Sequence, residues 1–310
     1  MSGFGQIAVV GLGLLGGSVA LGARQRGLAG RIVGATRNPQ AREQALASGS
    51  VDGIQPLAEV GRESDLVVLA TPVHAMAGVL EEISPSLGAG TIVTDVGSVK
   101  APLAETLPGL LPPGSCYVGS HPMAGSHQRG FEFADPDLFE GAACVVLDAG
   151  SPEPEQRLCA FWEGLGGRVV RLDALAHDEW VGWVSHLPHL MAFAFAQGLA
   201  DAPAGAQGVA GPGFHDFTRL ARSEPAMWAD ILSANRKALE GPLQHAVRAL
   251  SELSRTIEAG DPQALEEGLL RARQNLEPSP PAQGRDAESD ARPSQRQGST
   301  PDGDPETTHD

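Results

Sequence analysis

The sequence predicts an α/β protein in which a doubly wound parallel sheet is followed by an all-α C-terminal domain. Two observations lead to this prediction. Short aliphatic segments alternate with helical segments up to about residue 172, which is typical of a parallel sheet covered on both faces. From Ala174 to about Leu276, long segments with helical periodicity take their place.

The first strand is predicted at residues 6–10, and it ends in a glycine-rich turn that opens a helix. Gly11 permits the tight turn, Gly13 lets main-chain N–H groups approach a pyrophosphate, and Gly16 allows close packing of helix and strand. Strand, G-x-G-x-x-G and helix in this order predict a Rossmann-type dinucleotide-binding domain. The predicted cofactor contacts in this turn are Gly11, Leu12, Gly13, Leu14, Leu15 and Gly16.

The end of the second predicted strand bears on the choice of cofactor. An NAD-preferring fold usually has an acidic residue there, which binds the ribose 2′-hydroxyl. This chain has Thr36 and Arg37 instead, and a hydroxyl followed by a guanidinium suits a 2′-phosphate. A solvated arginine, with NAD held by other contacts, is the alternative. The cofactor is therefore NAD or NADP, undecided between the two.

Three predicted loops converge on the dinucleotide crevice, because ligands bind at the carboxyl ends of parallel strands. They are residues 70–73, which place Thr71 and Pro72 beside the cofactor, and residues 95–100 and 119–130. Strands near 142–147 and 169–172 complete the domain.

The density of proline and glycine in residues 119–130 predicts a loop that carries His121. A histidine at such a crevice is a candidate acid or base near neutral pH. Ser98 is either the N-cap of the next helix or a hydrogen-bonding partner of the substrate hydroxyl and of His121, and one hydroxyl can do both.

In the helical half, Ser185 and His189 are four residues apart and therefore lie on one helix face. Pro188 predicts a kink at which side chains can turn toward a cavity. Of Arg219 and Arg222, one suits a surface ion pair and the other a bidentate contact with a carboxylate. Long helices are predicted over 229–253 and 262–276. Their apolar residues exceed what one small domain buries, so we expect a homodimer through this half.

Composition limits the partners. The formal net charge is −16, and residues 277–310 contain eight acidic residues against three arginines. Nucleic acid and anionic membranes are therefore not expected partners. With no apolar segment near the roughly 20 residues of a membrane span, and no secretory signal pattern, we expect the protein in the cytoplasm. The predicted domains are 1–172, 173–276 and a disordered acidic tail at 277–310.

Taken together, these residues give the chain a resemblance to the prephenate/arogenate dehydrogenase family of tyrosine biosynthesis, over about residues 6–276. The specific motifs are five, and they occur in the family's order: Gly11–Ser18, Asp95–Lys100, Gly119–Gly125, Ser185–His189, and Asp216–Arg219 with Trp228.

The resemblance implies oxidative decarboxylation of a cyclohexadienol carboxylate, with no metal. His121 would be the base, with Ser98 orienting it, and Arg219 would bind the ring carboxylate. At His127, many members have an acidic residue, so the choice between prephenate and arogenate is open. Prephenate is the expected substrate and arogenate the alternative. The implied substrate contacts are Arg219, His189, Ser185, Trp228, Ser126 and His127.

Two other classes of protein share part of this pattern. A 3-hydroxyacid-type dehydrogenase usually relies on a lysine in the helical half, where this chain has only Lys237, outside every motif. An inactive cofactor-binding module predicts broken catalytic positions, whereas all of them are intact here.

Overall fold

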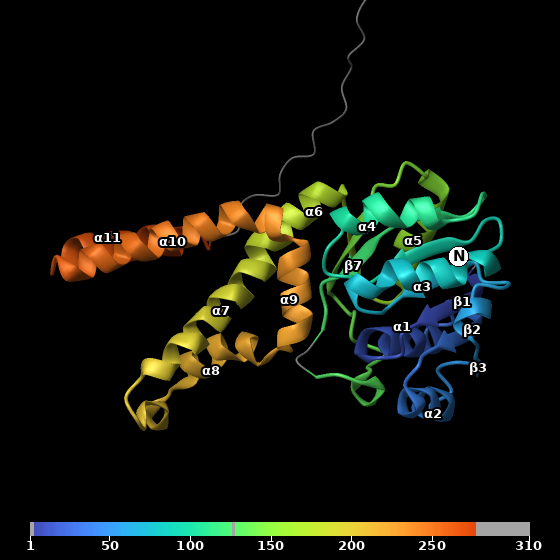
Figure 1. Cartoon of the computed structure of the whole chain (residues 1–310), viewed down its shortest axis with the longest axis horizontal. Helices are drawn as coiled ribbons and strands as arrows, with labels where there is room; N and C mark the ends of the chain where they lie inside the picture. The colour runs from blue at the N-terminus through green and yellow to red at the C-terminus, as the bar shows by residue number, and fades with distance from the viewer. Residues whose placement is uncertain (1–2, 126–127, 277–310) are drawn as a thin grey trace, which may run out of the picture. The chain divides into compact units, whose positions relative to one another are not determined.

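A six-stranded parallel sheet forms the N-terminal part of the protein, as the computed structural model shows for the described residues, 3–125 and 128–276 (Figure 1). The strand order is β3-β2-β1-β4-β5-β6. Strands β2 and β3 are therefore added on one side of β1, and strands β4 to β6 are added on its other side. This confirms the predicted doubly wound sheet. Its strands are β1 (Phe4–Val10), β2 (Ala29–Ala35), β3 (Gly53–Ile54), β4 (Leu66–Leu69), β5 (Ile92–Asp95) and β6 (Cys116–Tyr117).

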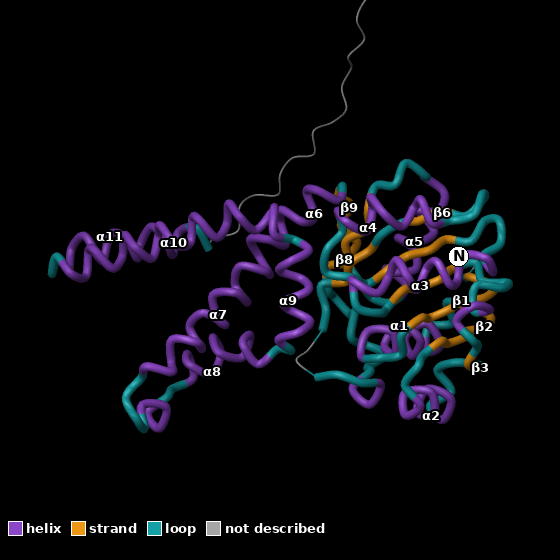
Figure 2. The backbone as a smooth tube through the Cα atoms, in the orientation of Figure 1, coloured by secondary structure: helices purple, strands orange, loops and turns teal. Residues whose placement is uncertain are grey.

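Both faces of this sheet are covered by helices (Figure 2). In β1, Ile7 and Val9 belong to the core on one face, and Ala8 and Val10 belong to the core on the other. The first face packs against α1, α2 and α5, and the second packs against α3 and α4. Burial on both faces explains why the strands are almost wholly aliphatic. The helices are α1 (Leu14–Gln25), α2 (Pro39–Ala47), α3 (Met76–Ile83), α4 (Ala101–Thr106) and α5 (Pro152–Gly164).

A second sheet has three strands, in the order β7-β8-β9. They are β7 (Ser120–Pro122), β8 (Ala143–Leu147) and β9 (Arg168–Leu172). Between β6 and β7 the chain therefore passes from the first sheet to the second. Tyr117 pairs with β5, whereas Ser120 pairs with Val146 of β8 in antiparallel register. The change of sheet occurs between these two residues, directly before His121.

The second half of the chain is helical, as predicted. Its helices are α6 (Ala174–Val181), α7 (Leu187–Gly198), α8 (Pro212–Arg219), α9 (Pro225–Ala234), α10 (Arg236–Glu258) and α11 (Pro262–Gln274). Near the predicted kink, a π-helical stretch (Gly182–His186) lies before Pro188, which lacks the N–H of a regular helix. The prediction of a single helix over 229–253 is wrong, because the helix is interrupted at Asn235, between α9 and α10.

Internal contacts divide the chain into two units, Met1–Arg248 and Ala249–Asp310. In the second unit, the end of α10 packs on α11, where Leu253 lies near Gly268. The side chain of Asp261 caps α11 by accepting from two main-chain N–H groups. The domain boundary expected at residue 172 stays a prediction, and the tail at 277–310 lies outside the described residues.

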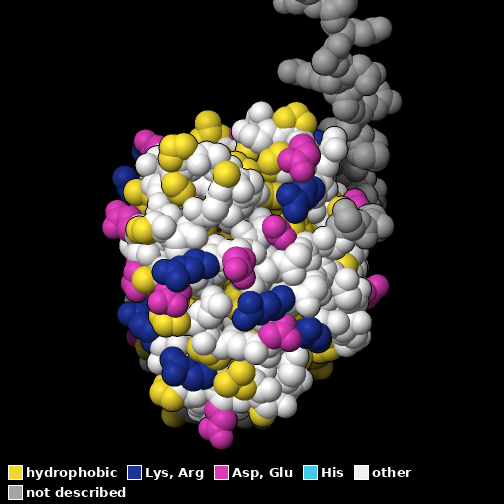
Figure 3. All heavy atoms as spheres, turned by 90° about the vertical axis from the view of Figure 1, so that its right-hand side faces the viewer, with side chains coloured by type: hydrophobic (Ala, Val, Ile, Leu, Met, Phe, Trp, Pro, Cys, Tyr) yellow, Lys and Arg dark blue, Asp and Glu magenta, His cyan; other side chains and the backbone are white. Residues whose placement is uncertain are grey.

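The surface of the first unit is chemically mixed. On the face drawn in Figure 3, acidic and basic side chains are interspersed with apolar ones. Within residues 3–125 and 128–276, no helix combines the length and the apolar character that a membrane crossing requires.

Candidate active site

The glycine-rich turn after β1 has the geometry that a bound dinucleotide needs. Gly11 has a φ of 96°, and a Cβ atom there would lie 2.5 Å from the carbonyl oxygen of Ala70. A Cβ at Gly16 would lie 1.9 Å from the carbonyl oxygen of Gly11. At Gly13, by contrast, a Cβ would meet no atom within 4 Å, so the space before helix α1 is open. The N-cap residue, Gly13, has no side chain to cap this helix, which leaves its first N–H groups for a phosphate.

Around this turn, the predicted cofactor residues have different surroundings. The side chain of Leu12 is buried in the core, so its main chain is the part that faces a ligand. Leu14 and Leu15, at the start of α1, are half-buried. The Oγ1 atom of Thr71 is buried without a hydrogen-bonding partner among the described residues, as expected if a ligand atom completes its bonding. Pro72, next to it, is exposed. These residues fit a nicotinamide dinucleotide.

The end of β2 presents Thr36 and Arg37. Thr36 is half-buried, and its hydroxyl accepts a hydrogen bond from the N–H of Asn38 at 3.2 Å. Arg37 is exposed and makes no ion pair within the part of the chain that the structure describes. Its guanidinium is therefore available to a cofactor phosphate.

His121 lies in a strand, and the prediction that it belongs to a loop is wrong. It pairs with Val145 in β8, and the Pro122 that follows is tolerated because β7 is an edge strand of its sheet. The preceding Ser120 fixes this strand to the end of β5: its hydroxyl donates to the carbonyl oxygen of Asp95 at 2.7 Å. His121 is buried, with 6% of its surface exposed.

A second histidine holds the ring of His121. The Nδ1 atom of His121 lies 2.9 Å from Nε2 of His177, and Nδ1 of His177 lies 2.7 Å from Oδ1 of Asp178. Burial, followed by electrostatic interactions with His177, Lys100 and His186, lowers the pKa of His121 well below its usual value. The ring is therefore neutral near pH 7 and able to accept a proton.

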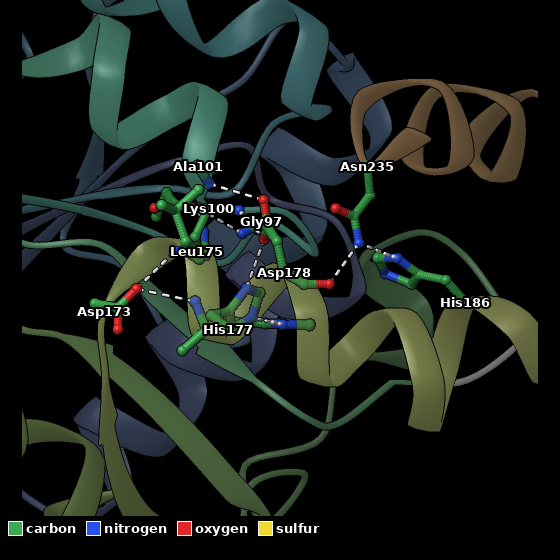
Figure 4. Close-up of polar contacts among 12 residues, drawn as sticks. Gly97, Lys100, Ala101, Asp173, Leu175, His177, Asp178, His186 and Asn235 are labelled. Carbon is green, nitrogen blue, oxygen red and sulfur yellow. Dashed lines mark hydrogen bonds and ion pairs between the residues drawn. The ribbon is translucent and has the colours of Figure 1, made fainter. Parts of the chain in front are cut away.

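The carboxylate of Asp178 also occupies the start of α4, as Figure 4 shows. It accepts from the main-chain N–H groups of Lys100 and Ala101, at 2.7 and 2.9 Å. The prediction that Ser98 caps this helix is wrong, because the N-cap position is Lys100 and the capping carboxylate comes from α6. Ser98 is half-buried, and the hydrogen-bonding partner of Nδ1 of His121 is His177 rather than Ser98.

The side chain of Lys100 forms a fully buried ion pair with Asp95. Asp95 also accepts hydrogen bonds from the hydroxyl of Tyr117, at 2.7 Å, and from the N–H of Gly97. Burial lowers the pKa of Lys100, and the adjacent Asp95 opposes that change. The side chain of Lys100 thus anchors the loop that leads from β5 to α4.

The π-helical stretch and α7 contribute Ser185, His186 and His189. His189 donates from Nδ1 to the main-chain oxygen of Ser185 at 2.9 Å, which places the two predicted residues together. His186 is fully buried, and its Nδ1 accepts from the amide of Asn235 at 2.9 Å. Burial lowers the pKa of His186 to about 4. The same amide bonds the main-chain oxygen of Asp178 at 2.8 Å and so joins α6 to the start of α10 (Figure 4).

The remaining predicted residues lie on α8 and α9. Trp228 is buried against Val99 of the β5–α4 loop and stacks on the ring of His189. Arg219 is exposed at the end of α8, and its positive charge contributes to lowering the pKa of His189. The structure thus groups Ser185, His189, Trp228 and Arg219. Ser126 and His127 lie outside the described residues.

His186 lies between His121 and this group, because its ring contacts that of Trp228 edge-on and it interacts electrostatically with His121. Sequence reasoning did not assign roles to His177, Asp178 or Asn235. The adjacent His177 and Asp178 at the start of the helical half were the available signal. Fold and site together define a dinucleotide-binding α/β oxidoreductase with a buried, neutral histidine.

Comparison with known proteins gives the family. Residues 19–171 match the family model of the prephenate dehydrogenase nucleotide-binding domain, and residues 173–271 match that of the prephenate dehydrogenase dimerization domain. The chain therefore belongs to the prephenate dehydrogenase family.

Individual relatives agree with this membership. The chain is 32% identical to prephenate dehydrogenase of Lactococcus lactis subsp. cremoris, over 84% of this chain and 73% of that protein. It is also 32% identical to cyclohexadienyl dehydrogenase of Zymomonas mobilis, over 84% and 91%. Among solved structures, A. aeolicus prephenate dehydrogenase in complex with hydroxyphenyl propionate and NAD+ has a TM-score of 0.80 at 30% identity, over 87% of this chain and 96% of that one.

Proposed function

We propose that this protein oxidises and decarboxylates prephenate to 4-hydroxyphenylpyruvate. The observation that carries the proposal is the neutral, buried His121, which is held at one ring nitrogen by His177 and lies in a strand that Ser120 fixes to the end of β5. Membership of the prephenate dehydrogenase family supports it.

The reaction makes two demands on the chain. A base must take the proton of the ring hydroxyl as the carbonyl forms, and a neutral imidazole suits this. A permanent cation must bind the ring carboxylate without protonating it, which suits Arg219 beside the stacked rings of His189 and Trp228. The bound nicotinamide would accept the hydride, while carbon dioxide leaves from the opposite ring carbon. Ser98 would share the substrate hydroxyl with His121.

For the cofactor, Arg37 supports NADP, because it is exposed beside the half-buried Thr36 at the end of β2. NAD is the alternative, and the A. aeolicus relative was solved with it. Steady-state kinetics with both cofactors, on the wild type and on Arg37→Ala, tests the preference. A preference for NADP that the substitution removes supports this role of Arg37, and a clear preference of the wild type for NAD contradicts it.

Arogenate is the alternative substrate, and one solved relative at 30% identity is an arogenate dehydrogenase from Synechocystis, with a TM-score of 0.74. The deciding experiment follows reduced cofactor by its absorbance, first with prephenate and then with arogenate. Turnover of prephenate with the higher kcat/KM is the expected result. An absence of reduced cofactor with both substrates would overturn the proposal.

A homodimer through the helical half is the proposed assembly. Large apolar side chains are exposed on it, among them Trp183, Leu250, Ile257 and Leu269, and the matched model of this half is a dimerization domain. Sedimentation equilibrium on the purified protein should give twice the chain mass of 32.1 kDa. A chain-sized mass at micromolar concentration would contradict it.

A further inference from the structure

Two hydrogen bonds link Asp178 to His121 through His177, and the donor and acceptor of each can be assigned. They begin at a carboxylate that is 3% exposed and accepts from the N–H groups of Lys100 and Ala101. These donors favour the charged carboxylate, and a charged carboxylate only accepts. Any ring nitrogen that bonds to Asp178 must therefore be the donor.

His177 is that donor, because its Nδ1 lies 2.7 Å from Oδ1 of Asp178. A neutral imidazole carries one ring hydrogen, so with Nδ1 protonated its Nε2 presents a lone pair. This Nε2 lies 2.9 Å from Nδ1 of His121. His121 must therefore donate from Nδ1, and the lone pair of His121 is then on Nε2.

The surroundings of His177 keep its ring neutral, as this order of bonds requires. The side chain is fully buried, and burial lowers its pKa. The hydrogen bond to Asp178 opposes that effect, and the positive charge of Lys100 adds to it. His186, whose pKa is also lowered by burial, lies nearby as a second neutral ring.

We propose that His177 is a positioning residue that holds His121 in the tautomer with a free Nε2 lone pair. The inference rests on the proposed function. In that reaction, the O–H bond of the substrate hydroxyl breaks and an N–H bond forms at Nε2 of His121. The electron pair of the O–H bond becomes part of the new carbonyl as hydride passes to the nicotinamide dinucleotide. The positive charge on His121 then faces the lone pair of His177, with the Asp178 carboxylate behind it.

Two substitutions separate this role from simple packing. In His177→Gln, the amide oxygen lies near the position of Nε2 and can still accept from His121. In His177→Met, a side chain of similar length fills the space without a comparable acceptor. His245→Met is the matched control, because His245 is an exposed histidine on α10.

We expect His177→Met to lower kcat by about 100-fold, at the lower end of what a general base contributes, with KM changed by less than about threefold. His177→Gln should keep kcat within about tenfold of the wild type, and His245→Met should leave it unchanged. If both His177 variants lose the same activity at the same melting temperature, or if His177→Met keeps wild-type kcat, the proposal is overturned.

A second measurement needs neither substrate nor turnover. Nitrogen-15 NMR of the histidine rings at pH 8, assigned by comparison with His121→Gln, reports which nitrogen of His121 carries hydrogen. The expected result is hydrogen on Nδ1 in the wild type and in His177→Gln, and a mixture of tautomers in His177→Met. Hydrogen on Nε2 in the wild type would overturn the proposal even if His177→Met fails to fold. A wild type that turns over neither substrate contradicts the proposed function and leaves the tautomer measurement to decide this inference.

Discussion

Trp228 stacks on His189 with ring centroids 3.7 Å apart and ring planes inclined by 19°. The two rings come from α9 and α7, and the charge of Arg219 at the end of α8 acts on His189. A flat pair of rings beside a guanidinium matches a cyclic substrate that carries a carboxylate. This grouping makes the role proposed for Arg219 testable.

Replacing Arg219 by alanine should raise KM for prephenate by about 10- to 100-fold, as expected for loss of a charge-assisted hydrogen bond of about 1.5–3 kcal/mol. The value of kcat should change by less than about threefold, because the cation binds a group that does not react with the base. Arg222→Ala is the matched control, since Arg222 is an exposed arginine three residues further on. Steady-state kinetics that show equal effects for the two arginines would contradict the assignment.

Replacing His121 by asparagine should lower kcat by about 10²- to 10⁴-fold, with little change in substrate affinity. Asparagine can still form a hydrogen bond near the Nδ1 position, but it cannot accept the proton. Substrate affinity can be measured separately by quenching of tryptophan fluorescence, because Trp228 lies in the site. Near-wild-type turnover in this variant would remove His121 from the role of base.

The open space at Gly13 predicts a variant that impairs cofactor binding while the fold is retained. Gly13→Ala should weaken dinucleotide binding by tenfold or more, about 1.4 kcal/mol, because the new methyl group occupies the space before α1. The free energy of unfolding should change by less than about 1 kcal/mol.

Gly109→Ala serves as its control, since a Cβ there also meets no atom within 4 Å and lies outside the turn. Isothermal titration with NAD and NADP gives the affinities, and urea unfolding gives the stabilities. Equal cofactor affinity in the Gly13 variant and in the wild type would mean that the dinucleotide does not approach this turn.

Stability should fall as the pH is lowered from 6.5 to 4. The pKa of His186 is 6.5 in the unfolded chain and about 4 in the folded protein, so the unfolded state binds more protons in this range. The contribution is complete above pH 6.5 and is lost as the pH falls toward 4, by about 3 kcal/mol for this residue. His121 and His177, whose pKa values are also lowered by burial, act in the same direction.

Urea unfolding of the wild type and of His186→Gln between pH 7 and pH 4.5 measures this dependence. The variant has no imidazole at this position, so its stability should depend less steeply on pH than that of the wild type. Parallel curves for the two proteins would show that His186 is not buried in the neutral form.

The sequence by itself determined the class of fold and the family. Turn chemistry and hydrophobic periodicity act over a few residues, so the Gly11–Gly16 turn, the buried strands and most helices could be predicted from local pattern. The resemblance to the family also named His121 and Arg219. The roles of Ser126 and His127 stay predictions.

Tertiary structure alone decided how the site is held together. His121 and His177 are 56 residues apart and meet only because β7 leaves the main sheet to pair with β8, beside the start of α6. Likewise, Asp178 rather than Ser98 caps α4, and Asn235 breaks a segment that has helical periodicity on both sides. Such contacts depend on how distant elements pack, and no local pattern in the chain encodes them.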